Sequence, residues 1–123
     1  MLGHRSTGFT LLEVLIALTV ASIALMAAMR AGGALAQASA EMRLRTHAQW
    51  SAENRLSAIR LTGEFPPLGR RSFECAIGSV ALRCVEEVFA TPNPSFRRIE
   101  LGVENPADRH RLARLTGFAV NQP

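Results

Sequence analysis

An apolar run near the N-terminus constrains this 123-residue chain more than any other feature. Residues 9–29 read FTLLEVLIALTVASIALMAAM, and Glu13 is the only charged side chain in the run. About 20 apolar residues in a helix cross the hydrocarbon core of a bilayer, which is ~30 Å thick. The sequence therefore predicts a transmembrane helix over 9–29, in a chain long enough for one further small domain.

Glu13 is the one residue of the run that needs an explanation. A carboxylate at bilayer depth costs ~2.5–3.5 kcal/mol or more, so an ordinary membrane anchor excludes it. In one interpretation, the side chain reaches back to the headgroup level from its place near the start of the run. The alternative depends on the polar leader MLGHRSTG, which carries Arg5 and ends in Gly8 directly before Phe9.

Residues 8–13, GFTLLE, resemble the type IV prepilin signature. The resemblance implies that a membrane prepilin peptidase cleaves between Gly8 and Phe9 and N-methylates the new amino terminus of Phe9. It also implies a role for Glu13 in assembly, because a buried carboxylate is tolerated where a cation, such as the amino terminus of a neighbouring subunit, pairs with it. Glycine suits the cleavage site, since it resists helix formation just before a stiff helix.

The helical pattern continues beyond the apolar run. Residues 34–62 contain no proline. Apolar side chains recur there at spacings of four and three, forming one stripe: Leu44, Ala48, Ala52, Leu56 and Ile59. Gly63 and the prolines after it then end the helix. We expect one helix over 9–62, with 30–62 as its periplasmic continuation, and either a bend or close helix packing at Gly32-Gly33.

Residues 63–123 predict a small β-rich head. Residues 98–104 alternate strictly and place Ile99, Leu101 and Val103 on one face. Residues 85–90 and 112–120 are further candidate strands, and 91–95 (TPNPS) predicts a hairpin turn. The expected fold class is α+β and type IV pilin-like, with a long N-terminal helix packed on a small antiparallel β-sheet.

Further residues narrow the resemblance to one family. They are Ala48, Trp50, the run AENRL at 52–56, Arg60-Leu61, Pro92 and the run RRIEL at 97–101. With the leader, they resemble the type II secretion minor pseudopilin called general secretion pathway protein I. The resemblance implies a structural subunit in the bacterial inner membrane with a cytoplasmic leader over 1–8, a single span and a periplasmic head. It also implies contacts with other minor pseudopilins and the major pseudopilin at the pseudopilus tip, which the subunit helps to nucleate and cap for export of folded proteins.

Two pairs of residues are candidate sites outside the leader. Cys75 and Cys84 are the only cysteines, and an oxidising periplasm favours a disulfide between them over two buried free thiols. We expect Trp50 to pack in the core beneath the sheet, with a partner surface as the alternative. Asn54 is expected to be an ordinary solvated or head-facing helix residue, with a partner contact as its alternative.

Other classes of function receive little support. The basic residues are 14 scattered arginines without a lysine, which argues against nucleic-acid binding. His4, His47 and His110 lack metal-ligand spacing, and we predict no enzyme, metal or cofactor. The alternatives to a type II secretion subunit are a minor pilin of a type IV pilus, or a secreted binding module whose signal is cleaved after Ala36 or Ala40.

Overall fold

The structure is a computed structural model that describes Gly3 and residues 8–122. The predicted leader therefore lies outside the described residues, apart from Gly3 and Gly8. One helix, α1 (Leu11–Thr62), precedes four strands: β1 (Gly69–Glu74), β2 (Arg83–Ala90), β3 (Phe96–Glu104) and β4 (Arg111–Val120). Contacts divide the chain into two units, residues 1–39 and 40–123.

Helix α1 begins two residues later than predicted and ends at the predicted residue, Thr62. It continues without interruption through Gly32-Gly33. At its C-terminus Gly63 adopts a positive φ of 67°, and the Glu64 amide donates to the Ile59 carbonyl oxygen at 3.1 Å. This left-handed C-cap is the one for which glycine is favoured. An 18-residue window of α1 has a mean hydropathy of 2.3, so the helix is long and apolar enough to cross a membrane.

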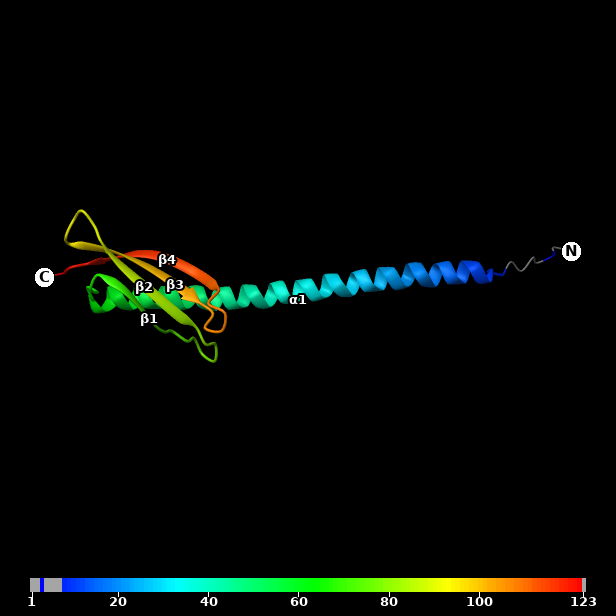
Figure 1. The fold of residues 1–123 in the computed structure, drawn as a ribbon, viewed down its shortest axis with the longest axis horizontal. Coiled ribbons are helices and arrows are strands. Elements are labelled where there is room, and N and C mark those ends of the chain that lie inside the picture. Colours follow the sequence, from blue (N-terminus) through cyan, green and yellow to red (C-terminus); the bar gives the residue numbers. More distant parts are fainter. Residues whose placement is uncertain (1–2, 4–7, 123) are drawn as a thin grey trace. The chain divides into compact units, whose positions relative to one another are not determined.

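The four strands form one antiparallel sheet in the order β1-β2-β3-β4, and they lie along the C-terminal part of α1 (Figure 1). This arrangement confirms the predicted α+β class. The turn over 91–95 joins β2 to β3 as predicted, and the Phe96 amide donates to the Asn93 carbonyl oxygen at 3.0 Å. Strands β2, β3 and β4 each begin one or two residues earlier than predicted.

Strand β1 was not predicted as a separate element. Its sequence, GRRSFE, has neither the alternation nor the β-branched side chains of a half-buried strand. Phe73 is the only apolar side chain larger than glycine in β1, and most of the strand is exposed. The strand forms through its pairing with β2 rather than through its own pattern.

The core of the head lies between one face of α1 and one face of the sheet. The predicted stripe faces inward: Ala48, Ala52, Leu56 and Ile59 are buried, and Leu44 packs against them at the edge of the core. The predicted row on β3 meets this stripe, since Ile99, Leu101 and Val103 are fully buried. The periodicities of helix and strand thus identified both sides of the core.

Gly117 of β4 is buried where the strand packs against Leu56 of α1. A Cβ at this position would lie 3.0 Å from both terminal carbons of Leu56, closer than ordinary van der Waals contact. We expect Gly117→Ala to lower the free energy of unfolding by about 1–3 kcal/mol, the usual cost of overpacking a core. Thermal unfolding followed by circular dichroism measures this effect. The matched control is Gly102→Ala on β3, where the added Cβ meets its nearest atom at 3.6 Å. Equal stability losses in the two variants would contradict the expected clash.

Candidate functional site

A reciprocal capping box closes the N-terminus of α1. The Glu13 amide donates to Thr10 Oγ1 at 3.2 Å, and the Thr10 amide donates to Glu13 Oε2 at 3.2 Å. The first amides of a helix have no partner within the helix, and in a bilayer no water replaces that partner. The Glu13 carboxylate therefore accepts a hydrogen bond from a backbone amide of its own chain, besides any contact that it makes with another subunit. This cap was not predicted, although T-x-x-E at 10–13 is its sequence signature.

Gly8 and Phe9 lie directly before this cap, outside the helix. The Phe9 side chain is 88% exposed, and a Cβ placed on Gly8 would have no atom within 4 Å. The peptide bond between them is therefore open to an enzyme, as a cleavage site requires. In sequence, Glu13 follows four residues after Phe9, and it lies in the first turn of α1.

We expect removal of the Thr10 hydroxyl to loosen the first turn of α1. Losing a threonine N-cap costs ~1 kcal/mol, which corresponds to about fivefold faster exchange of the amide that it held. Hydrogen exchange of the Glu13 amide in Thr10→Val, in detergent micelles, measures this loss. Thr19→Val is the matched control, since the Thr19 hydroxyl donates to the Leu15 carbonyl oxygen within the helix at 2.8 Å. Unchanged exchange at Glu13 in Thr10→Val would exclude the capping role.

Trp50 and Asn54 share an exposed face of α1. The prediction that Trp50 packs in the core is wrong, because its side chain is 52% exposed. The reason is helical geometry: at 100° per residue, position 50 lies 200° from the buried positions 48 and 52. Its ring packs edge-on against His47, with centroids 5.6 Å apart and planes at 84°. Leu61, 87% exposed, lies three turns further along the same face.

A charged cluster connects α1 to the sheet inside the head. Glu86 of β2 has no exposed side-chain surface, and its carboxylate accepts hydrogen bonds from Arg55 Nε at 2.8 Å and Arg71 Nε at 3.3 Å. Arg55 also bonds the Glu64 carboxylate at 3.1 Å. These bonds, chiefly the one to Glu86, raise the pKa of the Arg55 guanidinium, which therefore stays charged. Both guanidinium groups lie over the Phe73 ring, at 5.6 and 5.2 Å from its centroid.

Cys75 and Cys84 form a disulfide across the loop between β1 and β2. The buried Ser51 of α1 donates a hydrogen bond from its hydroxyl to the Cys75 carbonyl oxygen at 2.6 Å. Cys84 is fully buried against the same helix. The disulfide loop is thus attached to α1 in two ways: Cys84 packs against the helix in the core, and the Cys75 carbonyl oxygen accepts the hydrogen bond from Ser51.

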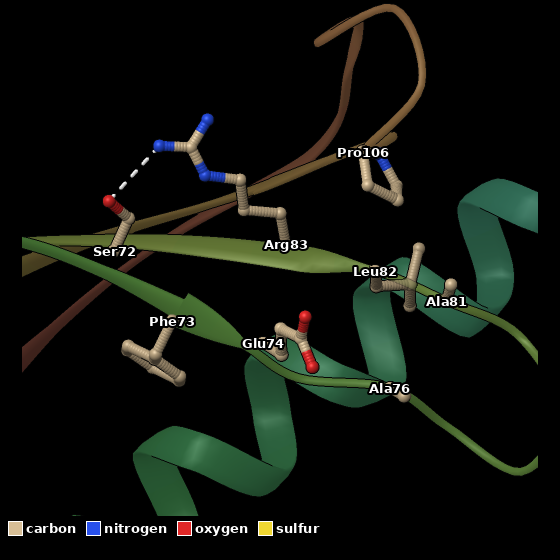
Figure 2. Close-up of a pocket in the computed structure, with 8 residues that line it drawn as sticks. All are labelled: Ser72, Phe73, Glu74, Ala76, Ala81, Leu82, Arg83 and Pro106. Carbon is tan, nitrogen blue, oxygen red and sulfur yellow. Dashed lines mark hydrogen bonds between the residues drawn. The ribbon is translucent and has the colours of Figure 1, made fainter.

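A hollow of about 370 Å³ in the head lies beside this loop (Figure 2). Eight residues line it: Ser72, Phe73, Glu74, Ala76, Ala81, Leu82, Arg83 and Pro106. The Ser72 hydroxyl accepts a hydrogen bond from Arg83 at 3.1 Å, and Phe73 points to the opposite side of β1 (Figure 2). Arginine cannot act as the base that a serine nucleophile requires. The arginine therefore does not activate Ser72 as a nucleophile. Gly3 and residues 8–122 contain no cluster of three metal-ligating side chains.

Comparisons with known proteins match both parts of the chain. Residues 3–29 match the family model described as the prokaryotic N-terminal methylation motif, which includes Gly8, Phe9 and Glu13. Residues 42–120 match the family described as type II secretion system (T2SS), protein I. This second match covers the head, including both cysteines and the charged cluster.

Two characterised relatives extend the similarity over nearly the whole chain. The type II secretion system protein I of Pseudomonas aeruginosa is 32% identical over 127 residues, covering 97% of this chain and 98% of the relative. The protein of the same name from Klebsiella pneumoniae is 28% identical over 118 residues, covering 95% and 98%. The chain therefore belongs to the type II secretion system protein I family and is a minor pseudopilin of that system.

Proposed function

We propose that this chain is a structural subunit, not an enzyme, that is processed at Gly8–Phe9 and then enters the tip of a periplasmic pseudopilus. Prepilin peptidase removes residues 1–8 on the cytoplasmic side and methylates the amino terminus of Phe9. Residues 9–29 then hold the subunit in the inner membrane, 30–62 continue the helix into the periplasm, and 63–123 complete the head there. The exposed Gly8–Phe9 bond directly before a capped apolar helix is the observation that carries this proposal.

The intact mass of the membrane-extracted chain tests the processing step. Co-expression with prepilin peptidase is expected to remove residues 1–8 and add one methyl group, whereas expression without the peptidase leaves the chain whole. Gly8→Val should block cleavage because a branched side chain adds bulk directly beside the scissile bond, where glycine has none. Gly3→Val, the same substitution elsewhere in the leader, should be cleaved normally. Cleavage after Ala36 or Ala40 would instead support a secreted module, although α1 is helical through both positions.

The partners that we propose are the other minor pseudopilins and, below them, the major pseudopilin. The exposed α1 face with Trp50 and Asn54 supports this assignment, because tryptophan is enriched among the residues that contribute most to binding at protein interfaces. Trp50→Ala is expected to weaken co-purification with the other minor pseudopilins by about 2 kcal/mol, or ~30-fold. Phe96→Ala, an exposed aromatic residue on the sheet, is the control. If Trp50→Ala and Phe96→Ala weakened co-purification equally, Trp50 would not be part of the interface.

A minor pilin of a type IV pilus is the alternative that the leader alone leaves open. It shares the leader and Glu13, so the N-terminal match alone does not distinguish the two systems. The match over 42–120 favours type II secretion.

A further inference from the structure

The two cysteines of the disulfide have different surroundings. Cys84 has no exposed surface and belongs to the core, whereas Cys75 is partly exposed and packs against the edge of that core. A cysteine thiol reacts where a reagent can reach it, and a thiol buried in a protein core is inert. The two sulfurs are therefore expected to differ in how readily an external reagent reaches them.

Cys84 is held in the interior of the sheet as well as in the core. It lies on β2 between two neighbouring strands, opposite Phe73 of β1 and Val103 of β3. Proteins open locally at a free energy that ranges from near zero in frayed segments to the full free energy of unfolding in core strands. Exposing the Cys84 sulfur should therefore require most of the free energy of unfolding.

Cys75 lies in the disulfide loop that follows β1, at the edge of the sheet. Its amide donates to the Leu82 carbonyl oxygen at 3.0 Å, and its carbonyl oxygen accepts the hydrogen bond from Ser51 at 2.6 Å. Two further backbone hydrogen bonds, between Ile77 and Val80, close the loop. In the part of the chain that the structure describes, β1 pairs with β2 alone, and it is mostly exposed. This segment can therefore open while β2 and β3 stay paired.

We propose that Cys75 is the thiol–disulfide exchange site of the head, and that Cys84 acts from the core as the resolving thiol. In this scheme, an external disulfide oxidises the head by forming a mixed disulfide with Cys75. The inference uses the proposed function only for the source of the oxidant, since an oxidising periplasm supplies disulfides. The roles of the two cysteines follow from their positions in the head.

Oxidation of the head then takes two exchange steps. Cys75 loses its proton to water, and its thiolate attacks one sulfur of the external disulfide, whose other sulfur leaves as a thiolate and takes up a proton. Cys84 then loses its proton and attacks Cys75 Sγ, which displaces the second sulfur of the oxidant in the same way. Two protein thiols are oxidised, and one external disulfide is reduced to two thiols.

The second step is favoured by the fold of the head. The Cα atoms of Cys75 and Cys84 lie 5.7 Å apart, within the range that a disulfide spans. Because β2 holds Cys84 at this place, its attack on a mixed disulfide is intramolecular and needs no collision with another molecule. A foreign thiol captured by Cys75 is therefore expelled, which protects the head from lasting crosslinks to other proteins.

Pulse alkylation of the reduced wild-type chain tests the difference between the two sulfurs. The full chain in detergent is reduced with dithiothreitol, freed of reductant without air, and exposed briefly to iodoacetamide. Peptide mass spectrometry is expected to show labelling of Cys75 at least about 100-fold faster than of Cys84. In denaturant the two rates should become similar, which controls for intrinsic reactivity. Equal rates without denaturant would overturn the proposal, and so would loss of the circular dichroism spectrum on reduction, because Cys84 could then not react from the core.

Ser51→Ala tests whether Cys75 is reached by opening of the disulfide loop alone. The substitution removes the hydrogen bond to the Cys75 carbonyl oxygen, and it is expected to speed labelling of Cys75 about fivefold while Cys84 stays unchanged. Ser57→Ala, at an exposed position of the same helix, is the matched control and should label like the wild-type chain. Equal acceleration of both cysteines in Ser51→Ala would show that exposure requires unfolding of the whole head, which would contradict the proposal.

Oxidised glutathione tests the resolving role of Cys84. Intact mass is expected to show one glutathione retained on Cys75 in the reduced Cys84→Ala variant. The reduced wild-type chain should instead release the glutathione and regain its own disulfide. A glutathione adduct that persists on the wild-type chain would overturn the role of Cys84. Processing at Gly8–Phe9 does not depend on either cysteine, so failure of these tests would leave the proposed function unaffected.

Discussion

Arg55→Ala is expected to lower the free energy of unfolding of the head by about 3 kcal/mol. It removes the closest partner of Glu86, whose carboxylate has no exposed surface, and it frees Glu64 as well. Breaking a buried ion pair from one side costs this much because the Glu86 carboxylate stays buried with only the half-exposed Arg71 as its partner. For a head of this size the loss corresponds to a drop in Tm of about 15 °C, measured by circular dichroism.

Arg45→Ala provides a matched control for this prediction. Arg45 also lies on α1 and pairs with a glutamate, Glu41, at 2.7 Å, but both side chains are about half exposed. An exposed pair of this kind contributes less than ~1 kcal/mol. Replacing Arg55 and Glu86 together by leucine should recover much of the stability, because no buried charge is left without a partner. Equal losses in Arg55→Ala and Arg45→Ala would show that the cluster contributes little.

The second large effect is expected on breaking the disulfide. A covalent loop of this length, with a sequence separation of nine, contributes about 3 kcal/mol in the chain-entropy model. The loss of stability should differ between the strands. The disulfide loop follows β1 directly, and it is attached to α1 by the buried Cys84 and by the hydrogen bond from Ser51. Hydrogen exchange in Cys75→Ala/Cys84→Ala should therefore accelerate most in β1, which is the least buried strand, and least in β3.

Reductant is the control for the disulfide prediction. It should lower the Tm of the wild-type chain and leave the Tm of the double alanine variant unchanged. Labelling of both cysteines by an alkylating agent without reductant would show that the thiols are free in the protein. A wild-type Tm that does not respond to reductant would show that the disulfide does not stabilise the head.

The elements that sequence analysis identified are those whose side chains follow a regular period. The inward stripe of α1 and the β3 row repeat at helix and strand spacing, so their burial was predictable before the fold was known. Glu86 was missed because a carboxylate at a core position of β2 is compensated by Arg55 and Arg71, both distant in sequence. Strand β1 was missed for the same reason, since it depends on pairing with a partner strand.

The errors at the candidate site have a different cause. The exposure of Trp50 was predictable from helical geometry, which places it on the opposite side of α1 from the buried stripe. The prediction of burial followed instead from the residue type, since tryptophan is usually largely buried. The cap formed by Thr10 and Glu13 was predictable from spacing alone. Intersubunit contacts have no signal of this kind within one chain, because the groups that satisfy them belong to another molecule.

The exposed position of Trp50 gives this protein a built-in optical reporter. The chain has one tryptophan and no tyrosine, so near-ultraviolet absorption and fluorescence emission come almost entirely from this indole ring. Because the ring is already half in water in the single subunit, melting of the head changes its surroundings little, whereas docking of a neighbour on that face of α1 removes water from it. A blue shift of the emission would therefore follow assembly in real time, without a label.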